Sequence, residues 1–148
     1  MKRKIYIGAD SAGFALKGEV IEHLKSQGYE CVNLGCDSAE SCHYPVFASK
    51  LCQKLQNGEA DLGILVCGTG IGMSLAANKV KGIRAACCSE HFSAKYTRLH
   101  NNSNVLCLGG RVIGVGTAIE LADLFVDTEF EGGRHENRVN KVMAIEND

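Results

Sequence analysis

The sequence predicts a doubly wound α/β fold, in which a five-stranded parallel sheet carries helices on both faces. Three observations lead to this prediction. Short apolar runs alternate with segments whose apolar residues recur at helical spacing. Glycine, proline and asparagine stand between the runs, where turns are expected. The length of 148 residues suits one compact domain, so we assign residues 1–148 to a single domain.

The first half of the chain alternates strand and helix twice. Lys4–Ala9 is an apolar run typical of a buried strand. A helix should follow, because apolar residues share one helical face until Gly28 stops the pattern: Leu16, Val20, Ile21 and Leu24. Residues 30–34 predict a second strand. Pro45 favours the first turn of a second helix, which ends at Asn57-Gly58.

The second half continues the alternation and ends on a helix. The remaining apolar runs predict strands at residues 62–67, 84–88 and 105–108. Helical spacing predicts helices at 72–78, around Phe92, Tyr96 and Leu99, at 113–126 and at 134–145. Right-handed crossovers put such helices above and below the sheet. We therefore expect a three-layer, Rossmann-like architecture with strand order 2-1-3-4-5 and a C-terminal helix.

Composition excludes several classes of protein. Hydrophobic residues make up 45% of the chain and charged residues 22%, which excludes intrinsic disorder. No apolar stretch approaches the roughly 18 residues of a membrane helix. With 16 basic and 17 acidic residues the net charge is -1, so no global field attracts nucleic acid or an anionic membrane. We expect neither as a partner.

The eight cysteines need an explanation of their own. Such a number suggests disulfides in short secreted chains, but here the N-terminus leads directly into a strand instead of a signal region. We interpret the cysteines as reduced thiols of a cytoplasmic protein, most of them packed in the core. Cys36, Cys42 and His43 lack the short Cys-x-x-Cys spacing of a zinc site, so we expect no metal.

Topology points to one crevice. In the predicted sheet the strand order reverses between the first and third strands, and ligands bind beyond the carboxyl ends of the strands at such a point. The loops that follow these two strands are Asp10-Ser11-Ala12-Gly13 and Cys67-Gly68-Thr69-Gly70-Ile71-Gly72. We expect both loops to line the ligand site.

The second of these loops carries the most distinctive chemistry. Its glycines allow a ligand to approach the backbone, and the helix behind them offers free N–H groups to an anion or a developing oxyanion. The same helix terminus favours the thiolate form of Cys67. Met73 stands where a dinucleotide fingerprint has its third glycine. The alternative is that this loop has no chemical role and is a tight strand-to-helix turn with an inert cysteine.

Basic side chains form a second candidate group. Arg134 and Arg138 are four residues apart on the last predicted helix, so both can reach one phosphate, with His135 and Arg111 as possible additions. The alternative is a solvated helix face whose arginines pair with nearby glutamates: Glu131, Glu136 and Glu146. His100 stands where a helix ends and is either a general base or a simple cation there.

These residues together resemble ribose-5-phosphate isomerase type B and its sugar-phosphate relatives, including galactose-6-phosphate isomerase. The resemblance covers nearly the whole chain. It depends on a set of short motifs: Gly8-x-Asp10, His43-Tyr44-Pro45, Cys67-Gly68-Thr69-Gly70-x-Gly72, Ala76-Ala77-Asn78-Lys79, Gly82-Ile83-Arg84-Ala85, Arg98-x-His100-Asn101, Gly110-Arg111-Val112, and Gly132-Gly133-Arg134-His135 with Arg138.

The resemblance implies interconversion of ribose 5-phosphate and ribulose 5-phosphate through a cis-enediol, a step of the pentose phosphate pathway, without metal or cofactor. It makes Cys67 the base between C1 and C2, Thr69 the proton shuttle between the oxygens, and His100 the residue that opens the furanose ring. It assigns substrate binding to Asp10, Tyr44 and Asn101 at the hydroxyls, Gly68, Gly70, Ile71 and Gly72 at the enediolate, and Arg111, Arg134 and Arg138 at the phosphate. It also implies a homodimer, or a tetramer of paired dimers, with each active site shared between subunits.

One position departs from the family pattern. Most type B isomerases have histidine after the first aspartate, where this chain has Ser11. Serine donates a hydrogen bond to substrate but supplies no positive charge. Two alternatives therefore stay open: an isomerase of a six-carbon aldose phosphate, such as allose 6-phosphate or galactose 6-phosphate, and a phospho-ligand binding module without turnover.

Overall fold

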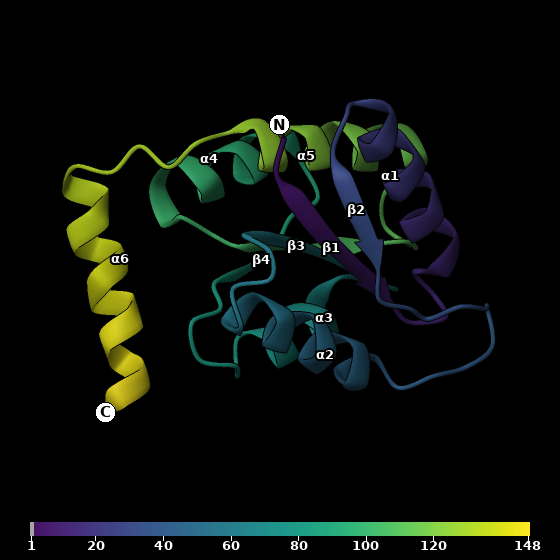
Figure 1. Ribbon diagram of the computed structural model, residues 1–148, viewed down its shortest axis with the longest axis horizontal. Helices are drawn as coiled ribbons and strands as arrows, with labels where there is room; N and C mark the ends of the chain where they lie inside the picture. Colours follow the sequence, from purple (N-terminus) through teal and green to yellow (C-terminus); the bar gives the residue numbers. More distant parts are fainter. Residues whose placement is uncertain (1) are drawn as a thin grey trace.

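The computed structural model describes residues 2–148, which fold around a five-stranded parallel sheet (Figure 1). The strands are β1 (Lys4–Ala9), β2 (Glu30–Asn33), β3 (Leu62–Cys67), β4 (Ala85–Cys87) and β5 (Val105–Gly109). The helices are α1 (Phe14–Ser26), α2 (Tyr44–Gln56), α3 (Ile71–Ala77), α4 (His91–Asn101), α5 (Val115–Asp127) and α6 (Arg134–Ala144), followed by a 3-10 turn, Ile145–Asn147.

The order of the strands corrects the prediction at one edge. The sheet runs β2-β1-β3-β5-β4, so the last two strands are exchanged relative to the expected 2-1-3-4-5. β5 is buried along its whole length, whereas β4 has three residues and is partly exposed. Because a strand covered on both faces is apolar throughout, β5 takes the inner position and β4 the edge. The reversal between β1 and β3, which places the crevice, is as predicted.

Helices cover both faces of the sheet. α1, α4 and α5 lie on one face, and α2 and α3 lie on the other (Figure 1). The alternation of side chains along β1 fits this arrangement, since Ile5 and Ile7 pack toward α1 and α5 while Tyr6 packs toward α2. None of the helices within residues 2–148 has the length and hydropathy required to span a bilayer.

The C-terminal helix α6 stands apart from the layered body (Figure 1). Only His135 and Val139 of this helix are buried. Val142, further along α6, is 57% exposed, and Ile145, just beyond it, is 65% exposed. Exposed apolar side chains along one side of a helix are typical of a surface that contacts another protein.

Candidate active site

Cys67 ends β3 and leads directly into the glycine-rich loop. Its side chain is 5% exposed, and the Gly70 N–H donates a hydrogen bond to its Sγ at 3.1 Å. Gly70 has φ +83°, a conformation that favours glycine, which allows the chain to turn back over the sulfur before α3 begins. The Ile71 N–H donates to Thr69 Oγ1 at 3.1 Å. The loop therefore holds a thiol and a hydroxyl in fixed positions.

The loop after β5 packs against this glycine-rich loop. The Gly110 N–H donates to the Cys67 carbonyl at 2.8 Å, and the Arg111 N–H donates to the Gly68 carbonyl at 3.0 Å. A Cβ on Gly109 would stand 2.7 Å from the Thr69 carbonyl oxygen, so only glycine fits there. These contacts bring the exposed Arg111 side chain beside Gly68.

The loop after β1 and the start of α2 complete the crevice. The Asp10 N–H donates to the Val66 carbonyl at 3.1 Å, and Asp10 Oδ1 accepts from the Gly13 N–H at 3.0 Å. Ser11 is the next residue and is half-buried. The Tyr44 ring lies against Gly72, where a Cβ would stand 2.8 Å from it. The structure thus brings together one set of predicted residues: Asp10, Ser11, Tyr44, Cys67, Gly68, Thr69, Gly70, Ile71, Gly72 and Arg111.

The remaining predicted residues lie elsewhere. A groove of about 940 Å³ runs between α6 and the segment around β4 and α4, and His100, Asn101 and Arg138 line it. Arg134 is exposed at the start of α6, one turn before Arg138. No residue of the glycine-rich loop lines this groove. One chain therefore presents a crevice and a groove as separate parts.

Glutamates do not neutralise the two arginines of α6. Within residues 2–148 no ion pair involves Arg134 or Arg138. Glu131 Oε2 instead lies 3.6 Å from His100 Nε2, and Glu146 Oε1 accepts a hydrogen bond from the Gly82 N–H at 2.8 Å. These two glutamates therefore do not pair with the arginines, and both guanidinium groups keep their donors for another anion.

Sequence reasoning missed the surroundings of His100. Among the described residues, one group of potential metal ligands is close together, and it consists of His100, Glu131 and His135, whose ligand atoms lie within 4.8 Å of one another. Cys36, Cys42 and His43 are not part of it. The spacing of Glu131 and His135, four residues apart, is a weak signal for this group, because Glu131 precedes α6 and the arginines of that helix are equally plausible partners in the sequence.

Comparisons with known proteins agree on one family. The family model described as Ribose/Galactose Isomerase matches residues 5–142. Ribose-5-phosphate isomerase B of Escherichia coli is 46% identical over 144 residues, which are 97% of each chain.

Two solved structures are close in both fold and sequence. The Clostridium thermocellum ribose-5-phosphate isomerase B has a TM-score of 0.95 at 46% identity over 97% of each chain. The Mycoplasma genitalium enzyme with bound ribulose 5-phosphate has a TM-score of 0.93 at 41% identity, covering 98% of this chain and 97% of that one. Similarity of sequence and fold over nearly the full length assigns this chain to the ribose/galactose isomerase family.

Proposed function

We propose that this protein interconverts ribose 5-phosphate and ribulose 5-phosphate through a cis-enediol, as a step of the pentose phosphate pathway in the cytoplasm. The observation that carries the proposal is the Cys67 thiol held beside the amides of the glycine-rich loop, with the Gly70 N–H 3.1 Å from Sγ. A base next to fixed donors is the arrangement that proton abstraction beside a carbonyl requires. Relatives named ribose-5-phosphate isomerase B support the choice of substrate.

The reaction balances within one substrate molecule. The Cys67 thiolate takes the proton from C2 of the open-chain aldose, the C1–C2 double bond forms, and the carbonyl oxygen O1 receives a proton. The O2 hydroxyl then loses its proton to become the ketone, and the Cys67 thiol returns a proton to C1. Thr69, whose hydroxyl is exposed in the loop, carries the proton between O2 and O1. Hydrogen only changes position, so no redox cofactor is needed.

Backbone amides stabilise the intermediate in this proposal. The first helical hydrogen bond of α3 runs from the Ser74 N–H to the Gly70 carbonyl at 3.1 Å. The Ile71 N–H is bonded to Thr69 Oγ1, so among the described residues the amides of Gly72 and Met73 are the ones before Ser74 without a hydrogen-bond partner. Negative charge on the enediolate oxygens grows only as the proton leaves carbon, so such prepositioned donors lower the barrier more than they strengthen ground-state binding.

Substrate binding divides between the crevice and the groove. Asp10, Ser11 and Tyr44 bind sugar hydroxyls from the crevice side, and Arg111, beside the glycine-rich loop, contributes to the phosphate site from there. On the groove side Asn101 binds a hydroxyl, His100 opens the furanose ring, and Arg134 and Arg138 hold the phosphate. The binding energy of the unreactive phosphate then positions the carbon acid against its base.

A homodimer with shared active sites would bring the crevice of one subunit and the groove of the other together. Its support is the open apolar surface of one chain: Ile71 and Leu75 on α3 are 55% and 62% exposed, and the groove beside α6 is open. Surfaces of this kind mark protein contacts. In the dimer the groove residues of one subunit face the crevice of its partner. Pairing of such dimers would give a tetramer.

The decisive experiment is incubation of the purified protein with ribose 5-phosphate while ribulose 5-phosphate is followed over time. We expect turnover in buffer without added metal or cofactor, and its loss in Cys67→Ala. Allose 6-phosphate is assayed in parallel, because Ser11 alters the substrate side of the crevice. Binding of ribose 5-phosphate without any product would make the protein a binding module, and faster turnover of allose 6-phosphate would change the substrate.

A further inference from the structure

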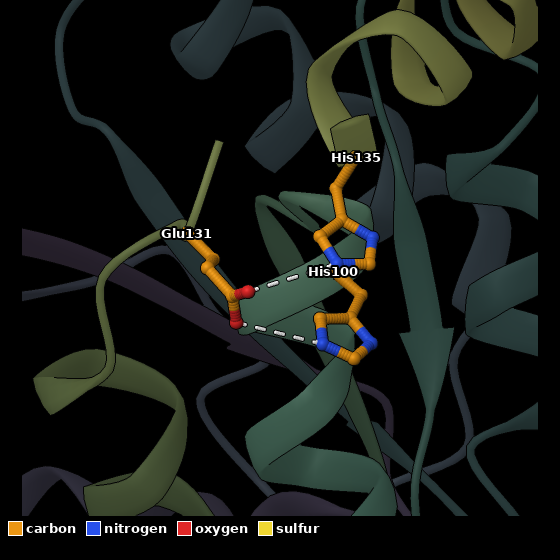
Figure 2. A group of neighbouring side chains, drawn as sticks. All are labelled: His100, Glu131 and His135. Atoms are coloured by element: carbon orange, nitrogen blue, oxygen red, sulfur yellow. Dashed lines mark ion pairs between the residues drawn. The ribbon is translucent and has the colours of Figure 1, made fainter. Parts of the chain in front are cut away.

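His100, Glu131 and His135 form a compact side-chain cluster between α4 and α6, which we call the histidine cluster. The Glu131 carboxylate spans both rings: Oε2 lies 3.6 Å from His100 Nε2 and Oε1 lies 3.8 Å from His135 Nε2. In Figure 2 each carboxylate oxygen is directed at one imidazole, and the second nitrogen of each ring lies on the side away from Glu131. The Glu131 carboxylate therefore lies next to the Nε2 atom of both imidazole rings.

The His100 ring is held on several sides. The His135 ring stacks on it with centroids 3.9 Å apart and an interplanar angle of 8°. Tyr96, one turn earlier in α4, meets it at 4.9 Å in an edge contact of 74°. With Glu131 at Nε2, the ring has little freedom to rotate. Its own side chain is still 35% exposed, so a part of the ring is open to the groove.

The backbone ties the cluster together. The Glu131 N–H donates to the carbonyl of Leu99, the residue before His100, at 3.0 Å. The His135 N–H donates to the Gly132 carbonyl at 3.1 Å, and the His135 residue is only 6% exposed. Burial, together with His100 and the arginines of α6, lowers the pKa of His135 below its ordinary value of 6.5. The ring beneath His100 is therefore held in place, and its surroundings favour the neutral form.

Metal binding does not explain the cluster, although two histidines and a carboxylate are a common zinc ligand set. The imidazole planes are parallel within 8°, so their in-plane lone pairs run side by side instead of converging on one point. Arg134 and Arg138 also act on His135 electrostatically, which disfavours a further cation. A role in orienting one imidazole fits the geometry better.

We propose that Glu131 is a positioning residue that keeps the proton of His100 on Nε2, so that Nδ1 presents a free lone pair to the substrate, with His135 as the stacking platform. This inference rests on the proposed function, in which His100 opens the furanose ring. Nδ1 takes the proton of the C1 hydroxyl, the C1 carbonyl forms as the bond from C1 to the ring oxygen breaks, and the proton is delivered to that oxygen. The carboxylate offsets the charge of the transient imidazolium.

Ring opening can be measured apart from isomerisation. In the Cys67→Ala background the enzyme cannot move the carbon-bound proton, but it still exchanges the α and β anomers of ribose 5-phosphate by opening the ring. Saturation-transfer NMR measures this exchange. We expect the Cys67→Ala protein to make anomer exchange faster than it is without protein. Adding Glu131→Gln to this variant should lower that acceleration at least about 10-fold, by analogy with carboxylates that orient catalytic or metal-bound histidines.

The matched control is Glu120→Gln. Glu120 lies on α5 and pairs with His91 at the other end of α4, so the substitution breaks a different histidine–carboxylate contact of α4 without touching the groove. We expect it to leave both exchange and isomerisation unchanged. In the otherwise wild-type enzyme, Glu131→Gln should lower kcat for ribose 5-phosphate with little change in KM. His135→Phe, which retains a flat ring, should preserve more exchange than His135→Ala.

The possible results separate the two proposals. If the wild-type enzyme does not isomerise ribose 5-phosphate, the proposed function fails. If it isomerises the sugar but Glu131→Gln exchanges anomers as fast as its parent, the positioning role is overturned. It is also overturned if Cys67→Ala gives no acceleration of exchange, or if Glu120→Gln is as damaging as Glu131→Gln. Thermal unfolding of each variant shows that the comparison is made between folded proteins.

Discussion

Gly13 lies directly against the carbonyl group of Val66, so close that a Cβ on Gly13 would stand 2.2 Å from the oxygen. The two residues belong to different strand–loop units, since Val66 is in β3 and Gly13 follows β1. The contact is accompanied by the hydrogen bond from the Asp10 N–H to the same carbonyl at 3.1 Å. Backbone proximity at this point sets the spacing between the two loops of the crevice.

Replacement of Gly13 tests this contact. Because backbone atoms cannot move aside as a flexible side chain does, Gly13→Ala should lower the free energy of unfolding by at least about 2 kcal/mol. Gly18→Ala is the control, since Gly18 is exposed within α1 and nothing lies within 4 Å of its Cβ position. It should stabilise the protein by about 0.5–1 kcal/mol. Urea unfolding measures the free energy of unfolding of both variants. If the two substitutions changed it equally, the proposed role of the Gly13–Val66 contact would be wrong.

Cys67→Ala tests the proposed base. We expect kcat to fall at least about 10²-fold while KM changes little, because a proton-transfer base acts mainly in the transition state. Alkylation of the wild-type enzyme should abolish activity, and substrate should slow this loss. Cys31→Ala, on β2 away from the crevice, should keep full activity. Turnover of Cys67→Ala at the wild-type rate would remove Cys67 from the mechanism.

Arg138→Ala tests the phosphate site. We expect KM for ribose 5-phosphate to rise at least about 10-fold, and Arg138→Lys to restore little of it, because lysine lacks the two-pronged guanidinium donor. Arg134→Ala should act in the same direction, and unphosphorylated ribose should be a very poor substrate. Lys141→Ala removes a charge from the same helix and should leave KM unchanged. Equal kcat/KM for ribose and ribose 5-phosphate would exclude a phosphate clamp.

Mixing of inactive variants tests the shared site. Cys67→Ala damages the crevice and His100→Ala damages the groove, so a heterodimer of the two has one intact site. Random exchange makes half of the dimers heterodimers, which gives up to about a quarter of wild-type activity. A mixture of Cys67→Ala with Asp10→Ala, both in the crevice, should stay inactive. A fully active monomer in light scattering, or no recovery in verified heterodimers, would contradict shared sites.

Buried thiols predict a loss of stability at alkaline pH. Burial raises the pKa of Cys52 from its ordinary value of 9.0 to about 12, and that of Cys88 to about 11. The folded state keeps these protons that the unfolded chain releases, so stability is full below pH 9 and declines above it. Between pH 8 and 10 each thiol should remove on the order of 1 kcal/mol from the free energy of unfolding. Cys52→Ala should flatten this pH dependence in urea titrations, and an unchanged slope would contradict the prediction.

The layout of the sheet follows from the sequence up to its outer edge. Each apolar run became a strand, because period and length separate buried strands from amphipathic helices. The exchange of β4 and β5 could not be derived from chain order, since spatial order depends on which strand is covered on both faces. Val105–Gly109 is longer and more apolar than Ala85–Cys87, and that difference was the available indication.

The candidate site was predictable where it depends on topology. Asp10 and Cys67 lie at the same edge of the sheet because neighbouring parallel strands end there, and the Asp10 N–H donates to the residue before Cys67. The groove was not predictable in the same way, since the position of α6 is set by packing beyond the layered body. For the same reason the contact of Glu131 with His100, which links the segment before α6 to the end of α4, has no local signature in the sequence.

Both outer strands of the sheet are short, with four residues in β2 and three in β4. A short border exposes few unpaired backbone N–H and C=O groups, so it gives a second sheet little to hydrogen-bond with. Continuous extension of the sheet from molecule to molecule, the usual route to fibrous aggregates, is therefore discouraged at both borders. In the proposed homodimer, association would use the helical surfaces instead, where side-chain shape selects the partner and closed symmetry limits the number of copies.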